Sequence, residues 1–221
     1  MMSAAVESNQ CMPTYGANST LTQFLDATAA RQPAPGGGSV SALVGALGAA
    51  IGEMVLNYSI GKKGLEAHQE SMRTALSEMH RARQLMVELV VEDQVAYQAL
   101  SLAKKLPKDS EQWEAEYPVA LEASINAPQL IAITAAAILD RCDRLVDIVN
   151  FYLLSDLAVC AELAMAAVRC GIYNVRVNEP ELTDPAQIKR VNKAVNNTLL
   201  HATQVIQRII PRIWERNRQG K

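Results

Sequence analysis

The chain has 221 residues, 49% of them hydrophobic, so it can bury a sizeable core as one large domain without disulfide or metal staples. Its 21 Lys and Arg nearly balance 23 Asp and Glu, and the formal charge of -2 gives no reason to expect nucleic acid or an acidic membrane as a partner. The absence of C-x-x-C and H-E-x-x-H patterns predicts reduced thiols and no metal.

Residues 1–18 are polar and aperiodic, which predicts a flexible arm ahead of a single helical domain over residues 19–221. No basic residue precedes Arg31, so the N-terminus lacks the charged region of a signal peptide. The longest uncharged apolar stretch, residues 40–52, is shorter than the ~20 residues that cross a bilayer. We therefore expect a cytoplasmic protein. Thr20 and Gln23 have capping-box spacing, which predicts the first helix from this point to Pro33.

The stretch P-A-P-G-G-G-S at residues 33–39 is the strongest local signal in the chain. Its prolines end the first helix, its glycines remove every side chain from the turn, and Ser39 is a favourable N-cap for a helix over 40–60. A bare backbone at a helix start offers N–H groups and the positive end of the dipole to a carbonyl, carboxylate or phosphate. A tight interhelical turn is the alternative, but three glycines in succession favour a ligand-binding loop. Its binding residues would be Pro35, Gly36, Gly37, Gly38 and Ser39.

The helix over 40–60 is apolar on nearly all sides and contains glycines at 45, 48 and 52, which predicts close packing in the centre of a bundle. After Gly61-Lys62-Lys63-Gly64, residues 65–106 contain neither Gly nor Pro and predict one helix of up to roughly 60 Å. Asp93 lies on its apolar stripe between Val90 and Tyr97. Desolvation there should raise the pKa of Asp93, unless a cation faces it in a structural ion pair.

The second half of the chain is also helical in pattern. Ser110 is a predicted cap, and Pro118 and Pro128 are expected to divide residues 111–150 into shorter helices. A helix capped by Ser155 is expected to end at Gly171, and Asp156 in its first turn suits either capping or catalysis.

A short extended piece is possible at 173–177, and the last helix should begin at Pro185 and bend or stop at Pro211. Residues 186–221 contain eight basic residues and one acid, a charge of +7 that leaves -9 for the rest. This excess predicts a solvated helix face or, less often, a patch that attracts an anionic ligand tail. No strand pair is convincing, so the predicted fold class is all-α.

Several motifs, in this order and spacing over about residues 21–178, resemble the formiminotetrahydrofolate cyclodeaminase and methenyltetrahydrofolate cyclohydrolase family. They are PAPGGGSV at 33–40, MVLN at 54–57, GKK at 61–63, EDQVAY at 92–97, LPK at 106–108, SD at 155–156 and N-V-x-V-N at 174–178. The resemblance implies an all-helical bundle with one very long helix that forms an intimate homodimer. It also implies an active-site cleft, a tetrahydrofolate derivative as substrate and no metal or other cofactor.

The resemblance also implies roles for individual residues. Asp93 would be the catalytic acid or base, Asp156 a second catalytic candidate, and Lys62 would orient Asp93 or bind the substrate glutamate. Further substrate-binding candidates are Asn57, Lys63, Tyr97, Asn150 and Ser155, beside the glycine loop. Two departures bear on activity: V-N-F-Y at 149–152 replaces the usual Gly-Asn-x-Asn, and an arginine usual after Leu-Pro-Lys is missing.

Both family reactions need proton transfer and charge stabilisation, which a carboxylate of raised pKa can supply. We expect cyclohydrolase activity first, because Tyr152 stands where the family has Asn and would alter a proton-donating position, and cyclodeaminase activity second. A non-catalytic helical dimer that binds folate or another protein is the alternative. A nucleotide-binding enzyme is disfavoured, since the glycine loop lacks the G-K-[ST] ending of a P-loop.

Overall fold

A computed structural model describes residues 14–108 and 110–219. Its helices are α1 (Leu21–Ala29), α2 (Gly37–Asn57), α3 (Gln69–Ala103), α4 (Glu111–Leu145), α5 (Leu154–Asn178) and α6 (Pro185–Gln219). Three short 3-10 turns, Glu66–His68, Phe151–Leu153 and Glu179–Glu181, complete the regular structure of this part of the chain, which has no strand. The predicted all-α fold with a very long helix is therefore confirmed.

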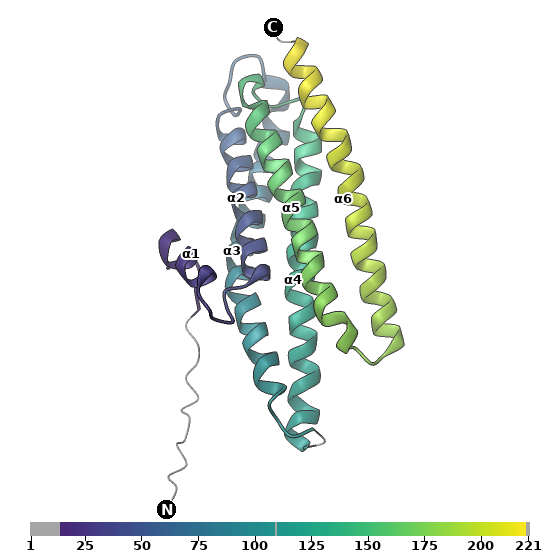
Figure 1. Ribbon diagram of the computed structural model, residues 1–221. Coiled ribbons are helices and arrows are strands. Elements are labelled where there is room, and N and C mark those ends of the chain that lie inside the picture. Colours follow the sequence, from purple (N-terminus) through teal and green to yellow (C-terminus); the bar gives the residue numbers. More distant parts are fainter. Residues whose placement is uncertain (1–13, 109, 220–221) are drawn as a thin grey trace, which may run out of the picture.

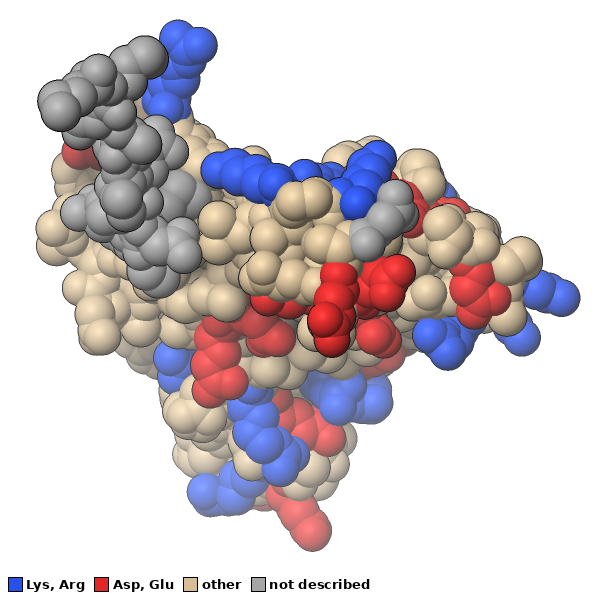
Figure 2. Space-filling view, turned by 90° about the horizontal axis from the view of Figure 1, so that it is seen from below, with Lys and Arg blue, Asp and Glu red and all other residues tan. Residues whose placement is uncertain are grey.

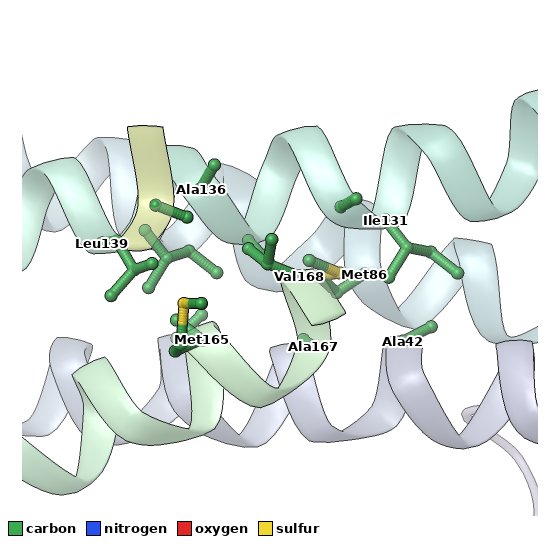
Figure 3. Packing of buried hydrophobic residues seen from close by; sticks show 14 of the residues in the cluster. Ala42, Met86, Ile131, Ala136, Leu139, Met165, Ala167 and Val168 are labelled. Carbon is green, nitrogen blue, oxygen red and sulfur yellow. The ribbon is translucent and has the colours of Figure 1, made fainter. Parts of the chain in front are cut away.

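Helices α2 to α5 form an up-and-down bundle, and α6 packs along its outside against α4 and α5 (Figure 1). The bundle is tight because small residues let backbones approach. A Cβ on Gly48 would lie 3.3 Å from the Cys160 carbonyl oxygen of α5, and one on Gly45 would lie 2.7 Å from Met86 of α3. The core between these helices is filled by small, branched and Met side chains (Figure 3). The expectation of a close-packed central helix is correct.

Two predicted caps are present. Thr20 Oγ1 accepts the Gln23 N–H at 3.2 Å and Gln23 Oε1 accepts the Thr20 N–H at 2.8 Å, which forms the expected capping box. Ser110 Oγ accepts the Trp113 N–H at 3.1 Å and starts α4. Ser39 is not a cap, contrary to expectation. Helix α2 begins two residues earlier with Gly36 as its N-cap, which leaves the Ser39 hydroxyl free for another partner.

Pro118 and Pro128 do not divide residues 111–150 into shorter helices, so that prediction is wrong, and the last helix does not stop at Pro211. Pro118 and Pro128 lie inside the continuous helix α4, and Pro211 lies inside α6. A proline inside a helix leaves the carbonyl four residues earlier without its N–H donor. For Pro128 that carbonyl belongs to Ser124, and it accepts a hydrogen bond from Asn178 Nδ2 at 3.0 Å. A side chain of α5 thus replaces the missing donor.

Helix α5 also differs from expectation at both ends. It begins at Leu154, so Ser155 lies in its first turn, and the preceding 3-10 turn is capped by Asn150, whose Oδ1 accepts the Tyr152 N–H at 3.2 Å. The helix continues through Gly171 to Asn178, which overturns both the predicted end and the extended piece at 173–177. Gly171 permits contact with α4, since a Cβ there would lie 2.8 Å from the Pro128 carbonyl oxygen.

Part of the basic excess of α6 is used inside the fold. Arg208 and Arg212 form ion pairs with Asp143 at 2.8 and 2.6 Å, and Arg212 also binds Asp147. Arg216 donates to the carbonyl oxygens of Val146 and Val149 beyond the C-terminus of α4. These three arginines therefore fasten α6 to α4 and are not free to form an anion-binding patch.

Residues 1–13 of the predicted arm lie outside the described residues, but Tyr15 is tied to α3 through two hydrogen bonds between its backbone and the Gln94 side chain.

Three helical segments, Gly37–Asn57, Glu111–Leu145 and Phe151–Glu181, are long and apolar enough to cross a membrane by length and composition alone. The absence of a membrane partner therefore stays a prediction.

Candidate active site

A cavity of about 390 Å³ opens where the glycine loop meets α3, α4 and α5. Helices α3 and α5 form its two long walls. Both helices run antiparallel to α2, so they advance in the same direction along the cavity. Its lining residues include the following polar and charged side chains: Asp93, Gln94, Tyr97, Ser101, Lys104, Ser124, Asn174, Asn178 and Glu181. Gly36, Gly37 and Gly38 supply bare backbone at one end.

Asp93 lies directly against the glycine loop. The Ser39 hydroxyl donates to Asp93 Oδ2 at 2.9 Å, and a Cβ on Gly38 would stand 1.9 Å from Asp93 Oδ1. Gly38 is thus required for close approach of the carboxylate. A positive φ occurs only at Gly61 and Gly64 among the described glycines, so left-handed backbone is not the reason for the three loop glycines.

Burial raises the pKa of Asp93 above the ordinary aspartate value, and hydrogen bonds from the Ser39 side chain and backbone oppose this rise. No Lys, Arg or His of residues 14–108 or 110–219 lies within salt-bridge distance of Asp93. The structural ion pair considered from sequence is therefore not formed in the described chain. The expected rise in pKa is present, and the carboxylate faces a cavity.

Asn174 stands on the opposite wall. Its Nδ2 donates to the Cys170 carbonyl oxygen at 2.8 Å, and its Oδ1 lies 3.3 Å from where a Gly37 Cβ would be. Asn174 and Asn178 were not predicted as site residues, although both belong to the N-V-x-V-N motif. Their spacing of four residues would have placed them on one helical face had a helix been expected there.

The predicted site residues fall into two groups. Gly36, Gly37, Gly38, Asp93 and Tyr97 line the cavity, while Pro35 and Ser39 are buried immediately behind the loop. The remaining six, which we call the distal group, lie at the other end of the bundle: Asn57, Lys62, Lys63, Asn150, Ser155 and Asp156.

Two members of the distal group contact neighbouring residues at this end of the bundle. Lys62 Nζ lies 5.1 Å from the centre of the Tyr152 ring, and the Asn150 N–H donates to Ser59 Oγ at 2.9 Å. Helix α2 has 21 residues, so about 30 Å separates this group from the glycine loop. One chain does not bring the distal group to Asp93.

No group of three or more His, Cys, Asp or Glu side chains in the described residues is arranged to hold a metal ion. The expected absence of a cofactor stays a prediction.

The fold and site are those of an all-helical bundle with a desolvated carboxylate beside a glycine loop, open to a cavity. The family model described as formiminotransferase-cyclodeaminase matches residues 20–197, and the chain belongs to this family. It is 29% identical to a methenyltetrahydrofolate cyclohydrolase of Methylorubrum extorquens over 87% of this chain and 94% of that protein. It is 32% identical to the formimidoyltransferase-cyclodeaminase of Gallus gallus over 83% of this chain.

The fold agrees with a solved member. The crystal structure of formiminotetrahydrofolate cyclodeaminase from Thermotoga maritima superposes with a TM-score of 0.83, at 27% identity, over 90% of this chain and 97% of that chain. The chain spans only 35% of the length of the Gallus gallus protein. It corresponds in extent to the two shorter relatives.

Proposed function

We propose that the protein is an enzyme of folate one-carbon metabolism that hydrolyses 5,10-methenyltetrahydrofolate, with Asp93 as its general base. The observation that carries the proposal is the position of the Asp93 carboxylate. Burial raises its pKa, it lies against the backbone of the glycine loop, and it faces a cavity of about 390 Å³. Membership of the family and the matching length of the cyclohydrolase relative support the substrate class.

The chemistry follows from one carboxylate. The ionised Asp93 stabilises the cationic methenyl carbon and accepts a proton from the attacking water as the carbon–oxygen bond forms. Protonated Asp93 then returns this proton to N5 as the carbon–N5 bond breaks, and the hydroxyl proton of the adduct leaves to solvent. The products are 10-formyltetrahydrofolate and one proton.

Cyclodeamination is the second candidate, and the Thermotoga maritima relative favours it. There, N10 would attack the formimino carbon, and Asp93 would transfer a proton from N10 to the departing ammonia. Our first preference for hydrolysis came from Tyr152, but Tyr152 lies with the distal group, about 30 Å from the loop in the same chain. Length does not separate the two reactions, because the cyclohydrolase and the Thermotoga maritima cyclodeaminase both match the extent of this chain. We keep hydrolysis first because it needs only a bound water and one base, whereas cyclodeamination also needs a proton donor for the departing nitrogen.

Offering the two folates separately tests the assignment. We expect the methenyl chromophore to disappear from 5,10-methenyltetrahydrofolate faster than in buffer alone. Faster release of ammonia from the 5-formimino compound would reassign the enzyme as a cyclodeaminase. Silence in both assays, with folate still bound in equilibrium dialysis, would instead establish the non-catalytic alternative.

We further propose that two copies form an antiparallel homodimer across α2 and α5. Large apolar side chains on this face are solvent-exposed in one chain: Leu47 is 51% exposed, Val159 46% and Tyr173 62%. An apolar groove between the two helices continues from the cavity, since Gly37 and Asn174 line both. Burial of this face against a second copy would remove it from water.

Such a dimer would also give the distal group a role. Leu47 lies midway along α2, ten positions after its first residue, Gly37, and ten before its last, Asn57. A two-fold axis near Leu47 would therefore set the glycine loop of one chain opposite the distal group of the other. Each site would then combine Asp93 of one chain with Lys62 of the partner subunit.

Mixing two inactive variants tests the shared site. We expect Asp93→Asn and Lys62→Met to be inactive as separate homodimers. Their co-expression should restore about a quarter of wild-type activity, since half of randomly formed dimers are mixed and each mixed dimer keeps one intact site. No recovery in mixed dimers, or full activity of Lys62→Met alone, would contradict the shared site.

A further inference from the structure

The chemical character of the cavity changes along its length. Asp93, Tyr97 and Leu100 of α3 line the cavity together with Lys104, the C-cap of α3. Lys104 stands eleven positions after Asp93, which corresponds to roughly 16 Å. On the opposite wall, α5 and the turn after it advance in the same direction from Asn174 through Val177 to Glu181. The cavity is therefore polar beside the glycine loop and charged at its far end. In the middle, Tyr97, Leu100 and Val177 give apolar and aromatic surface, beside the polar Ser101 and Asn178.

Lys104 is held at that charged end by a specific network. Its Nζ lies 2.6 Å from Glu181 Oε1, and the Tyr117 hydroxyl donates to Glu181 Oε2 at 2.7 Å. Tyr117 in turn stacks on Trp113, with ring centres 4.8 Å apart. Glu181 therefore has a partner for each oxygen, whereas the Lys104 ammonium has three hydrogens and uses one of them on Glu181.

Within this network, the Glu181 carboxyl group is ionised at neutral pH. Burial favours a higher pKa for Glu181, but the hydrogen bonds from Lys104 and Tyr117 outweigh it and lower the pKa below the usual value. Burial and the neighbouring Glu181 raise the pKa of Tyr117 to about 12, so its hydroxyl stays protonated and keeps donating. Lys104 is thus fixed in direction, while its side chain remains 44% exposed and can be reached by a ligand.

We propose that Lys104 binds the glutamate carboxylate of the folate substrate and so sets the preference for glutamate-bearing folates. This inference rests on the proposed function, because it takes the one-carbon unit to lie at Asp93. Lys104 is the only Lys or Arg among the described residues that line the cavity. Lys62, which the sequence suggested for this role, lies with the distal group at the other end of the bundle in one chain. In the dimer proposed above, Lys62 of the partner subunit would stand beside Asp93, roughly 16 Å from Lys104.

The order of groups along the cavity matches the order of groups in the substrate. With the reacting carbon at Asp93, the aminobenzoyl ring would lie along Tyr97, Leu100 and Val177, which offer aromatic and apolar surface. The glutamate would then extend toward Lys104, whose two remaining N–H groups suit a carboxylate. On the face of the molecule seen from below, basic side chains gather beside a group of acidic ones, so this end carries charges of both signs (Figure 2).

Removing the charge of Lys104 should have the same effect on KM as removing the glutamate from the substrate. We would compare 5,10-methenyltetrahydrofolate with 5,10-methenyltetrahydropteroate, which lacks the glutamate, in wild type and Lys104→Met. Loss of one charge-assisted hydrogen bond predicts a rise in KM of about tenfold to a hundredfold for wild type on the pteroate, with kcat little changed. Lys104→Met should show that raised KM on both substrates and no longer distinguish them.

Lys105→Met is the matched control, because Lys105 is the next residue, is exposed and does not line the cavity. We expect it to discriminate as wild type does, and Lys104→Arg to restore most of the preference in a folded protein. Equal KM values of wild type for both substrates, or equal effects of the two Met variants, would overturn the role of Lys104. Failure of wild type to convert either substrate would instead overturn the proposed function.

Discussion

Asp93→Asn is expected to lower kcat on 5,10-methenyltetrahydrofolate by about 10²- to 10⁴-fold, the usual contribution of a positioned general base. The amide keeps the volume of the carboxylate and can still accept the Ser39 hydroxyl, which lies 2.9 Å from Asp93 Oδ2. It cannot take a proton from water. Because no described cation pairs with Asp93, the substitution leaves no buried charge unpaired, and the free energy of unfolding should change by less than about 1 kcal/mol.

The matched control for this variant is Glu92→Gln, which removes a carboxylate from the exposed neighbouring position of α3. Steady-state kinetics and thermal unfolding would be measured on both proteins. We expect Glu92→Gln to retain wild-type kcat. A large fall in melting temperature for Asp93→Asn, with kcat preserved, would mean that the carboxylate is structural.

The second large effect is expected at Gly38. A Cβ added there would stand 1.9 Å from Asp93 Oδ1 and 2.7 Å from Oδ2, so the carboxylate would have to swing away from the loop. Displacing a catalytic group by about 1 Å can reduce turnover about 10²-fold. The three nearest atoms all belong to the Asp93 carboxyl group, with Cγ at 2.4 Å, and none is a backbone atom. Because only this side chain has to rotate, Gly38→Ala should lose activity with little loss of stability.

Gly36→Ala gives the comparison within the same loop. A Cβ on Gly36 would meet nothing closer than the Pro33 carbonyl oxygen at 3.9 Å, and the backbone there is extended, with φ of -118°. We expect near wild-type kcat for this variant and loss of activity for Gly38→Ala. Similar activity in both would show that close approach of Asp93 to the loop is not needed for catalysis.

Much of the fold follows from local sequence, and the errors have a common physical cause. The Thr20 and Ser110 caps depend on neighbouring residues and are readable from spacing alone. The continuity of α4 through Pro128 depends on Asn178, a residue of another helix that binds the freed Ser124 carbonyl. Likewise, Gly171 looks like a helix end but serves contact with α4. Hydrogen bonds and contacts supplied by another helix leave no pattern in the sequence around the proline or the glycine.

The parts of the site that depend on local sequence could be predicted, and those that depend on contacts between helices could not. Asp93 could be predicted because it interrupts an apolar helical stripe. The glycine loop could be predicted because three successive glycines lose much conformational entropy on folding, which favours a role in ligand binding. Lys104 and Glu181 are 77 positions apart, and only the fold brings them together. The distal group was assigned to the same site because a motif order does not specify which end of a bundle each motif occupies.

The pH dependence of kcat/KM for 5,10-methenyltetrahydrofolate tests the role of Asp93 most directly. The base works as a carboxylate, so activity should be lost as pH falls through the raised pKa of Asp93, above the ordinary aspartate value of about 4. Burial favours the neutral form in the fold, so the stability that Asp93 contributes is present at low pH and lost as pH rises through the same pKa. We predict an acid limb above pH 4 in wild type that is absent from the residual activity of Asp93→Asn. A limb that persists in Asp93→Asn, or a wild-type profile that is flat down to pH 4, would contradict the assignment of Asp93 as the base.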